Sequence, residues 1–302
     1  MLLQTISTRC SRPGRRCTAR SSPASPTSAA DIGRLDAELV RRGLARSRGE
    51  ARELVTAGQV LVEGLPTTKP SHPVEVGVDV EVRGGSPRWV GRAAHKLVAA
   101  FDAWSPEGLS AAGRRCVDVG SSTGGFTQVL LAEGATHVVA VDVGHGQLAP
   151  ELARDTRVED RSGTTVRGLT AEDIGGAADV VVADLSFISL PLVMPDLAGL
   201  RAEEGDLVVL VKPQFEVGGG RVDRHGVVRS GPDREAALLG VVVAVQENGL
   251  HVHGILESPV RGATGNIEYL LWARSDPSDT MSEDRIRDTV RAVTTDPSGG
   301  RG

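Results

Sequence analysis

The chain is poor in aromatic residues. Phenylalanine, tryptophan and tyrosine make up only 3% of its 302 residues, whereas hydrophobic residues together reach 40%. A core must therefore consist mainly of valine, leucine, alanine and isoleucine. The hydrophobic fraction and the 24% of charged residues are otherwise ordinary for a soluble globular protein. The length allows two compact domains, or one domain with appendages.

Long apolar runs and cysteines are also scarce. No apolar stretch approaches the ~18–20 residues that a bilayer-spanning helix needs, so we do not expect a membrane protein. The only cysteines are Cys10, Cys17 and Cys116. Their spacing fits no metal site and they cannot all pair, which is typical of a reducing compartment. We therefore expect a cytoplasmic protein without a bound metal.

Acidic residues are absent from residues 1–30, which are rich in arginine, serine and proline. This composition fits a disordered basic tail, a transit peptide or a start codon placed too early, and we expect the tail. The net charge of −5 disfavours a nucleic-acid binder as a whole. Up to about Lys96, however, arginines outnumber acids, and beyond it aspartate and glutamate dominate. This asymmetry predicts a basic module that faces RNA or phosphate, joined to an acidic module.

Residues 31–83 have the pattern of a small α+β domain. Asp31 is placed to cap a first helix and Ser47 a second one. Short apolar stretches at 60–62 and 78–82 predict strands. Two helices and a small sheet are therefore expected before a glycine- and proline-containing linker, residues 84–91.

Basic side chains can gather on one exposed face of this small domain. They are Arg34, Arg41, Arg42, Arg46, Arg48, Arg52 and Lys69. The planar fork of arginine suits phosphate, although most charge runs are simply solvated faces. Here, however, three further stretches match a known domain as well. They are Ser47-Arg48, Gly58-Gln59-Val60 and Lys69-Pro70-Ser71. Over the whole module the sequence resembles the RNA-binding domain named after ribosomal small-subunit protein four, which implies that these side chains contact structured RNA.

A glycine-rich turn in the stretch CVDVGSSTGGF, residues 116–126, follows an apolar strand and precedes a helical pattern. Such a turn makes a pocket for a nucleotide-like ligand. It lacks the second glycine of the dinucleotide fingerprint, so a pyrophosphate fits poorly and S-adenosylmethionine fits better. Asp142 ends the next strand, where an acid can accept both hydroxyls of a ribose.

Strands and helices alternate after this turn. Strands are expected at 137–143, 164–166, 179–184, 207–212, 252–257 and 267–272, with helices at 190–200 and 234–247. This order predicts a mainly parallel sheet with helices on both faces. Ligands of such sheets bind beyond the carboxyl ends of the strands, where Gly120, Asp142, Asp184 and Lys212 all fall. One active site is therefore expected at that edge.

Two further charged residues belong to this prediction. Lys96 begins a helix, where a lysine opposes the helix dipole, so a substrate phosphate or a neighbouring acid would explain it, and the alternative from this segment alone is a solvent-exposed lysine. Glu268 stands at the start of the last expected strand. Two lysines and two carboxylates can therefore converge. In the polar residues 276–302, Ile286, Val290 and Val293 are spaced for a short helix that packs back on the sheet.

The stretches AAHKL, DVGSSTGGFT, VDVGHGQL, ADLSFISL, VKPQFE, GVVR and GNIEYL carry a second resemblance. The large module, residues 92–275, resembles the FtsJ-like ribose 2′-O-methyltransferases, which have a Lys-Asp-Lys-Glu tetrad. Both modules in this order resemble the hemolysin-named TlyA family of rRNA methyltransferases. The resemblance implies a Rossmann-like S-adenosylmethionine-dependent methyltransferase fold, with Lys96, Asp184, Lys212 and Glu268 as the catalytic tetrad.

The resemblance also implies a cofactor site and a substrate. The residues expected to bind S-adenosylmethionine are Gly120, Ser121, Ser122, Thr123, Gly124, Asp142, Asp173 (or Glu172 beside it) and Asp184. The implied reaction is cytidine 2′-O-methylation of 16S or 23S rRNA, or both, in assembled ribosomal subunits. Whether Lys212 would stabilise the oxyanion or act as the base is open. The alternatives are a non-catalytic RNA-binding assembly factor and a membrane-active hemolysin.

Overall fold

The computed structural model describes residues 32–42, 44–45, 47–75, 77–83 and 89–295. The expected basic tail, most of the expected linker and Arg46 lie outside these residues. Contacts between residues divide the chain into two compact units, with the division between residues 86 and 87. Each unit has its own hydrophobic core.

The first unit is a small α+β fold. Its elements are β1 (Ile32–Arg34), α1 (Leu35–Arg41), α2 (Arg48–Thr56), β2 (Val60–Val62), β3 (Leu65–Thr67), β4 (Pro73–Glu75) and β5 (Val80–Val82). Strands β1 and β4 form an antiparallel pair, and β3, β2 and β5 form an antiparallel sheet in that order. Leucines and valines from α1, α2 and the strands fill the core between them.

The two helix starts expected in this unit have different outcomes. Ser47 caps α2 as predicted, because its side chain accepts a hydrogen bond from the Glu50 N–H. The expected cap at Asp31 is wrong. Residues 32–34 pair with β4, so α1 begins only at Leu35, with Arg34 as an N-cap that makes no side-chain hydrogen bond.

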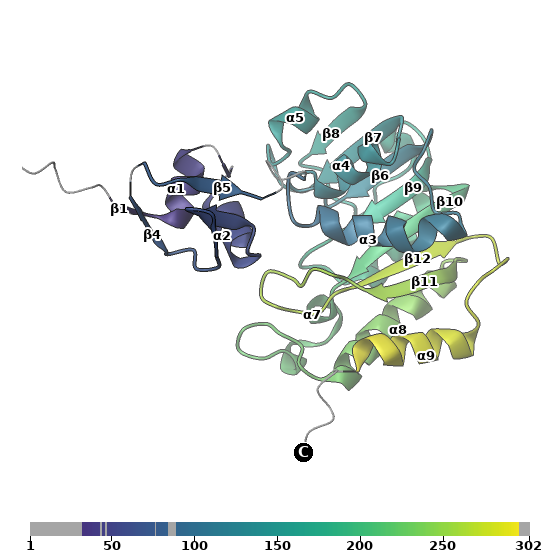
Figure 1. The fold of residues 1–302 in the computed structure, drawn as a ribbon. Coiled ribbons are helices and arrows are strands. Elements are labelled where there is room, and N and C mark those ends of the chain that lie inside the picture. Colours follow the sequence, from purple (N-terminus) through teal and green to yellow (C-terminus); the bar gives the residue numbers. More distant parts are fainter. Residues whose placement is uncertain (1–31, 43, 46, 76, 84–88, 296–302) are drawn as a thin grey trace, which may run out of the picture. The chain divides into compact units, whose positions relative to one another are not determined.

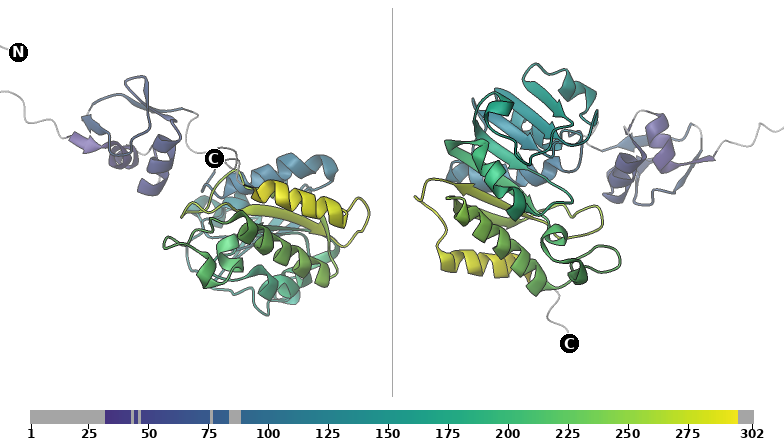
Figure 2. Two further views of the ribbon diagram at one scale, coloured as in Figure 1. Left: turned by 90° about the horizontal axis from the view of Figure 1, so that it is seen from below. Right: turned by 180° about the vertical axis from the view of Figure 1, so that it is seen from behind.

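The second unit contains a seven-stranded sheet between helices (Figures 1 and 2). Its elements are α3 (Ala94–Trp104), the 3-10 helix η1 (Ser105–Glu107), β6 (Arg115–Val119), α4 (Gly125–Ala132), β7 (His137–Asp142), α5 (Pro150–Ala153), β8 (Val158–Ser162), η2 (Glu172–Ile174), β9 (Ala178–Ala183), α6 (Leu190–Gly199), β10 (Arg201–Val211), α7 (Pro213–Glu216), η3 (Gly219–Arg221), α8 (Gly231–Glu247), β11 (His251–Glu257), β12 (Tyr269–Arg274) and α9 (Glu283–Thr294). The strand order is β11-β12-β10-β9-β6-β7-β8, and only β12 runs antiparallel to its neighbours. This is the α/β Rossmann-like architecture expected from the sequence.

Helices cover both faces of this sheet. One core cluster joins the sheet to α6, α8 and α9, and the other joins it to α3 and α4. The alternation along β9 divides its side chains between the two clusters, with Val181 on one face and Val182 on the other. In α9, Ile286 and Val290 are buried in the first cluster. The helix expected from their spacing therefore packs back on the sheet as predicted.

Two strand predictions need correction. The strand expected at 164–166 does not form, because the edge strand β8 lies earlier, at Val158–Ser162, and pairs only with β7. Its sequence VEDRS has no apolar alternation, so its hydrophobic pattern could not reveal it. Strand β10 begins at Arg201 rather than at residue 207, with a register shift between Arg201 and Asp206.

The order of the strands creates the crevice in which a ligand can bind. From β6 the chain continues through β7 and β8 on one side, and then returns to β9 and β10 on the other side. Connections that leave a central strand in opposite directions open a gap beyond the carboxyl ends of the strands.

Candidate active site

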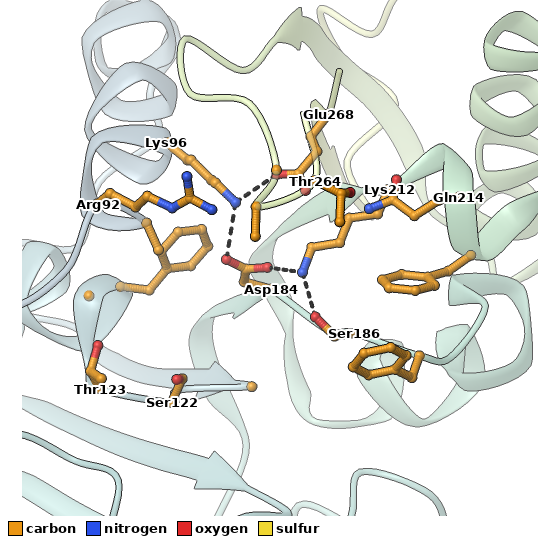
Figure 3. A pocket seen from close by; sticks show the side chains of 18 of the residues that line it. Arg92, Lys96, Ser122, Thr123, Asp184, Ser186, Lys212, Gln214, Thr264 and Glu268 are labelled. Carbon is orange, nitrogen blue, oxygen red and sulfur yellow. Dashed lines mark hydrogen bonds and ion pairs between the residues drawn. The ribbon is translucent and has the colours of Figure 1, made fainter. Parts of the chain in front are cut away.

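A cavity of about 570 Å³ opens at this crevice. It is lined by the residues that follow three parallel strands, namely Gly120 after β6, Asp184 after β9 and Lys212 after β10. Glu268 precedes the antiparallel strand β12 and Lys96 lies in the first turn of α3, and both line the same cavity. The structure thus brings together the four charged residues that the sequence predicted (Figure 3).

Asp184 lies between the two lysines (Figure 3). Its Oδ1 is 2.6 Å from the Nζ of Lys212, and its Oδ2 is 3.6 Å from the Nζ of Lys96. Lys96 also donates a hydrogen bond of 2.6 Å to Oε2 of Glu268. All four side chains are largely buried, so two cations and two anions compensate one another away from water. A neighbouring acid therefore accounts for the position of Lys96.

The use of lysine here is selective. The chain has only three lysines among its 34 basic Lys and Arg residues, and two of the three are Lys96 and Lys212. Both are buried, with relative exposures of 5% and 8%. Arginine keeps its proton under all conditions met by proteins, whereas lysine can release one. The basic side chains that line the cavity are thus these two lysines and Arg92.

Ser186 and Phe187, which follow Asp184, were not predicted as site residues. Lys212 donates a hydrogen bond of 2.8 Å to the Ser186 hydroxyl. Phe187 is 91% exposed at the cavity and has a positive φ of 63°, an unusual conformation for a bulky side chain. The motif ADLSFISL placed both residues directly after a strand end, but only the structure shows that Ser186 reaches Lys212.

The glycine-rich turn forms another wall of the cavity through Gly120, Ser121, Ser122 and Thr123. Gly120 has a φ of 87°, and a Cβ built there would lie 2.6 Å from the carbonyl oxygen of Asp184. Only glycine fits such a position. Gly124 caps α4 with a φ of 93°, and a Cβ there would collide with Leu152, although Gly124 itself does not line the cavity.

The two other predicted cofactor residues lie outside the cavity lining. Asp142, at the end of β7, accepts hydrogen bonds from the N–H groups of Ser122 and Gly144. It therefore ties the glycine turn to the neighbouring strand. Asp173 is exposed on η2, where its carboxylate accepts from the N–H and hydroxyl groups of Thr170, which lowers its pKa. A role for either aspartate in binding a ligand stays a prediction.

Asp118 lies beneath the turn and was also missed by sequence reasoning. It is fully buried in β6 and accepts hydrogen bonds from the N–H and hydroxyl groups of Thr127 in α4. Burial raises the pKa of Asp118 to about 7, although the two hydrogen bonds from Thr127 oppose this effect. Its carboxyl group therefore holds the start of α4, which carries the glycine turn, against the sheet.

Asn266 holds together two loops that border the cavity. It is 1% exposed, accepts a hydrogen bond from the Val228 N–H and donates one to the Gly226 carbonyl. The loop before α8 is thereby fixed to the loop that leads to Glu268. The motifs GVVR and GNIEYL, which are distant in the sequence, thus meet at one side of the cavity.

In the first unit, a buried carboxylate organises three of the predicted RNA-binding arginines. Asp36 is fully buried and lies 3.0 Å from Arg34, 3.2 Å from Arg52 and 3.6 Å from Arg48. The hydrogen bond from Arg34 is the main cause that holds the pKa of Asp36 far below its usual range. The three arginines remain about half exposed, so their positive charge is available at the surface.

A second buried acid, Glu38, holds Arg41 and Arg42. Arg41 is exposed, as predicted, and so is Lys69. Arg42 is an exception to the predicted exposed face, because its guanidinium also donates to the Val78 carbonyl and its side chain is only 20% exposed. Its second hydrogen bond, which joins α1 to the segment before β5, is the physical reason for this burial.

Family models match both units: residues 33–80 match the S4 domain and residues 89–275 match the FtsJ-like methyltransferase. A protein named 16S/23S rRNA (cytidine-2′-O)-methyltransferase TlyA from Mycobacterium tuberculosis is 51% identical over 266 residues, which are 87% of this chain and 98% of the relative. The chain belongs to the TlyA family of FtsJ-like methyltransferases. Both resemblances seen in the sequence are thereby confirmed.

Other members of the TlyA family carry the hemolysin name. Hemolysin A of Brachyspira hyodysenteriae is 36% identical over 247 residues, covering 78% of this chain and 98% of the relative. A solved structure described as a hemolysin from Streptococcus thermophilus has 33% identity and a TM-score of 0.67, and it covers 88% of this chain and 95% of that one. In the described part of this TlyA-family chain, no helix has both the length and the apolar character needed to cross a membrane.

Proposed function

We propose that this protein is an S-adenosylmethionine-dependent methyltransferase that modifies the 2′-hydroxyl of a cytidine ribose in ribosomal RNA. The observation that carries this proposal is the convergence of Lys96, Asp184, Lys212 and Glu268 in one cavity beyond the strand ends. The name of the Mycobacterium tuberculosis relative supports the choice of rRNA and cytidine. The predicted cytoplasmic location agrees with this substrate.

The residues around the glycine turn fit S-adenosylmethionine. Glycine at position 120 lets the turn pass close to the Asp184 carbonyl, and the turn lacks the full glycine pattern that a pyrophosphate needs. Asp184, which lines the cavity, would supply negative charge beside a ligand that carries a positive sulfonium. When bound, S-adenosylmethionine supplies an electrophilic methyl group. Gly120 to Gly124 would hold its methionine part, Asp142 its ribose, and Asp173 or Glu172 its adenine.

In this proposal Lys212 would act on the ribose hydroxyl. Asp184 and Ser186 hold its Nζ, so the amine has a fixed position in the cavity. The Lys212 amine would either stabilise the negative charge that develops on the 2′-oxygen or, after losing its own proton, accept the hydroxyl proton at Nζ. Lys96 and Glu268 would bind the same ribose. Fixed positions of this kind contribute up to ~7–11 kcal/mol to lowering a barrier in favourable cases.

The first unit would bring the RNA to this site. Arg34, Arg41, Arg48, Arg52 and Lys69 present positive charge at its surface, and Asp36 and Glu38 hold these four arginines, and also Arg42, in place. Phosphate contacts from such a surface bind structured RNA through its shape. We propose assembled ribosomal subunits as the substrate, since rRNA has its folded shape there.

Two variants of Lys212 test the proposal. The assay is the transfer of labelled methyl groups from S-adenosylmethionine to small and large ribosomal subunits, followed by mapping of 2′-O-methyl sites. Lys212→Ala should abolish transfer while binding of cofactor and RNA persists. Lys212→Arg should also be inactive if the amine accepts the proton, and should keep activity if charge stabilisation suffices. Full activity of Lys212→Ala would overturn the mechanism. RNA binding without methylation by the unchanged protein would favour a non-catalytic assembly factor.

A further inference from the structure

Two segments of the second unit lie side by side at the cavity and contact each other at several points. Residues 184–189 lead from β9 into α6, and residues 212–216 lead from β10 through α7. Lys212 contacts the first segment at Asp184 and at Ser186. Farther along, the ring centroids of Phe187 and Phe215 are 5.2 Å apart. The position of the Lys212 amine therefore depends on how the two segments are aligned.

Glu216 makes the last of these contacts, at the start of α6. Its Oε2 accepts a hydrogen bond of 2.6 Å from the Ser189 hydroxyl, and its Oε1 accepts one of 2.9 Å from the Leu190 N–H. Ser189 is the N-cap residue of α6, but its own side chain makes no capping hydrogen bond. Glu216 caps the helix in its place, and a carboxylate suits the positive end of the helix dipole.

Glu216 is partly buried, so its contact with the start of α6 is a specific packing contact rather than a loose surface interaction. Burial raises the pKa of its carboxyl group, while the hydrogen bonds from Leu190 and Ser189 favour the charged form. Among the described residues, no basic side chain forms an ion pair with it. The carboxylate is therefore held by the helix start alone, and loss of its oxygens would leave the Leu190 N–H without this partner.

The segment that Glu216 holds is strained. Phe187 lies between the two hydrogen-bonded serines and has a φ of 63°. A bulky residue keeps such a conformation only where its surroundings impose it. Lys212 holds Ser186 on one side of Phe187, and Glu216 holds Ser189 on the other. If the contact at Ser189 is lost, the segment can relax, and Ser186 and Asp184 then no longer fix the Lys212 amine.

We infer that Glu216 is a positioning residue for the methyl transfer: by capping α6 it aligns residues 184–189 with residues 212–216 and so sets the place of the Lys212 amine. Glu216 itself does not line the cavity. The inference rests on the proposed function, because it assigns Glu216 a role in the same reaction. A positioning role differs from a purely structural one because loss of the Glu216 carboxylate then changes the rate of the chemical step.

The test compares Glu216→Ala with Glu216→Gln in the full-length protein. The readouts are the single-turnover rate of methyl transfer to ribosomal subunits at saturating RNA and cofactor, and the Kd for S-adenosylmethionine from calorimetry. Glu216→Ala should lower the rate about 10- to 100-fold, since a misplacement of ~1 Å can cost a factor of that order. The Kd should change less than about twofold. Glu216→Gln should recover most of the rate, because its amide oxygen still accepts from Leu190 and its NH₂ group can donate to Ser189.

Ser282→Ala provides a matched control for lost stability. Ser282 caps α9 by accepting a hydrogen bond from the Arg285 N–H, and Ser282 does not line the cavity. The variant removes a cap from the same unit without touching either segment. It should lower the Tm by a similar amount as Glu216→Ala and leave the single-turnover rate unchanged.

The outcomes separate this inference from the proposed function. A rate for Glu216→Ala equal to that of the unchanged protein overturns the inference, and so does an equal loss of rate in Ser282→Ala. In either case the proposed function stands as long as the unchanged protein methylates rRNA. If the unchanged protein does not methylate rRNA, the proposed function fails, whatever the variants do.

Discussion

The Nζ atom of Lys96 lies 2.6 Å from Oε2 of Glu268, although 172 positions separate the two residues in the chain. The side chains are only 7% and 3% exposed. Breaking such a pair by removing one member leaves an uncompensated buried charge. The pair of Lys96 and Glu268 therefore joins α3, the first helix of the second unit, to the residue that precedes β12.

Lys96→Met should destabilise the second unit by about 3–5 kcal/mol, because it leaves the buried carboxylate of Glu268 without its lysine. The double variant Lys96→Met/Glu268→Leu should be closer to the unchanged protein. Urea unfolding followed by tryptophan fluorescence measures this, since Trp89, Trp104 and Trp272 all lie in the second unit. Equal stability of the single variant and the unchanged protein would contradict the prediction.

Gly120→Ala should both destabilise the fold and weaken cofactor binding more than tenfold. Its φ of 87° strains any side chain, and the new Cβ would lie 2.6 Å from the Asp184 carbonyl. Gly113→Ala is the matched control, because Gly113 has a φ of 73° but no atom within 4 Å of a built Cβ. It should cost about 1–2 kcal/mol for the strain alone and leave the Kd for S-adenosylmethionine unchanged. Similar cofactor affinity in both variants would speak against the cofactor site.

The first unit should lose stability as the pH falls from about 4.5 to about 2. Hydrogen bonds from Arg41 and Arg42 lower the pKa of Glu38 to about 2. A carboxyl group whose pKa is lower in the folded state stabilises the fold above its unfolded pKa, and this contribution disappears as it becomes protonated. Glu38→Gln should therefore flatten the pH dependence.

Amide hydrogen exchange in residues 35–62 can follow this loss, because the unit contains no tryptophan or tyrosine. Glu81→Gln changes an exposed glutamate of the same unit and serves as the control. A pH profile of Glu38→Gln that matches the unchanged protein would contradict the prediction.

Arg48→Ala and Arg42→Ala should have different effects on RNA binding. Arg48 is 56% exposed, so its loss should weaken binding and reduce the slope of log K against log salt by up to about 1. Arg42 is turned inward to Glu38 and the Val78 carbonyl, so its loss should mainly destabilise the first unit. Filter binding to rRNA over a range of salt concentrations distinguishes the two variants. Identical salt slopes would contradict the distinction between Arg48 as an RNA contact and Arg42 as a structural residue.

Much of the site could be predicted from the sequence for a geometric reason. The carboxyl ends of parallel strands share one edge of a sheet, so Asp184 and Lys212 had to meet. Glu268 reaches the same edge because β12 is antiparallel and begins where its neighbours end. Lys96 was assigned through the family resemblance, and its unfavourable place at a helix start was the physical signal.

What the sequence could not reveal depends on contacts between distant side chains or on missing periodicity. Strand β8 has no alternating apolar pattern, so pairing with β7 alone defines it. The hydrogen bond between Lys212 and Ser186 and the inward turn of Arg42 depend on side-chain placement, which spacing does not determine. Asp118 looks like any polar residue in an apolar run, and only the structure shows that its carboxyl group accepts two hydrogen bonds from Thr127 in the first turn of α4.

Asp184 takes part in both halves of the site at once. Its backbone N–H donates to Val119, its carbonyl oxygen lies against Gly120, and its carboxylate stands between the two lysines. A single amino acid thus supports the glycine turn that we propose to hold the methyl donor and carries the carboxylate that we propose to act beside the acceptor. A shift of β9 would therefore disturb the glycine turn and the charged cluster at the same time.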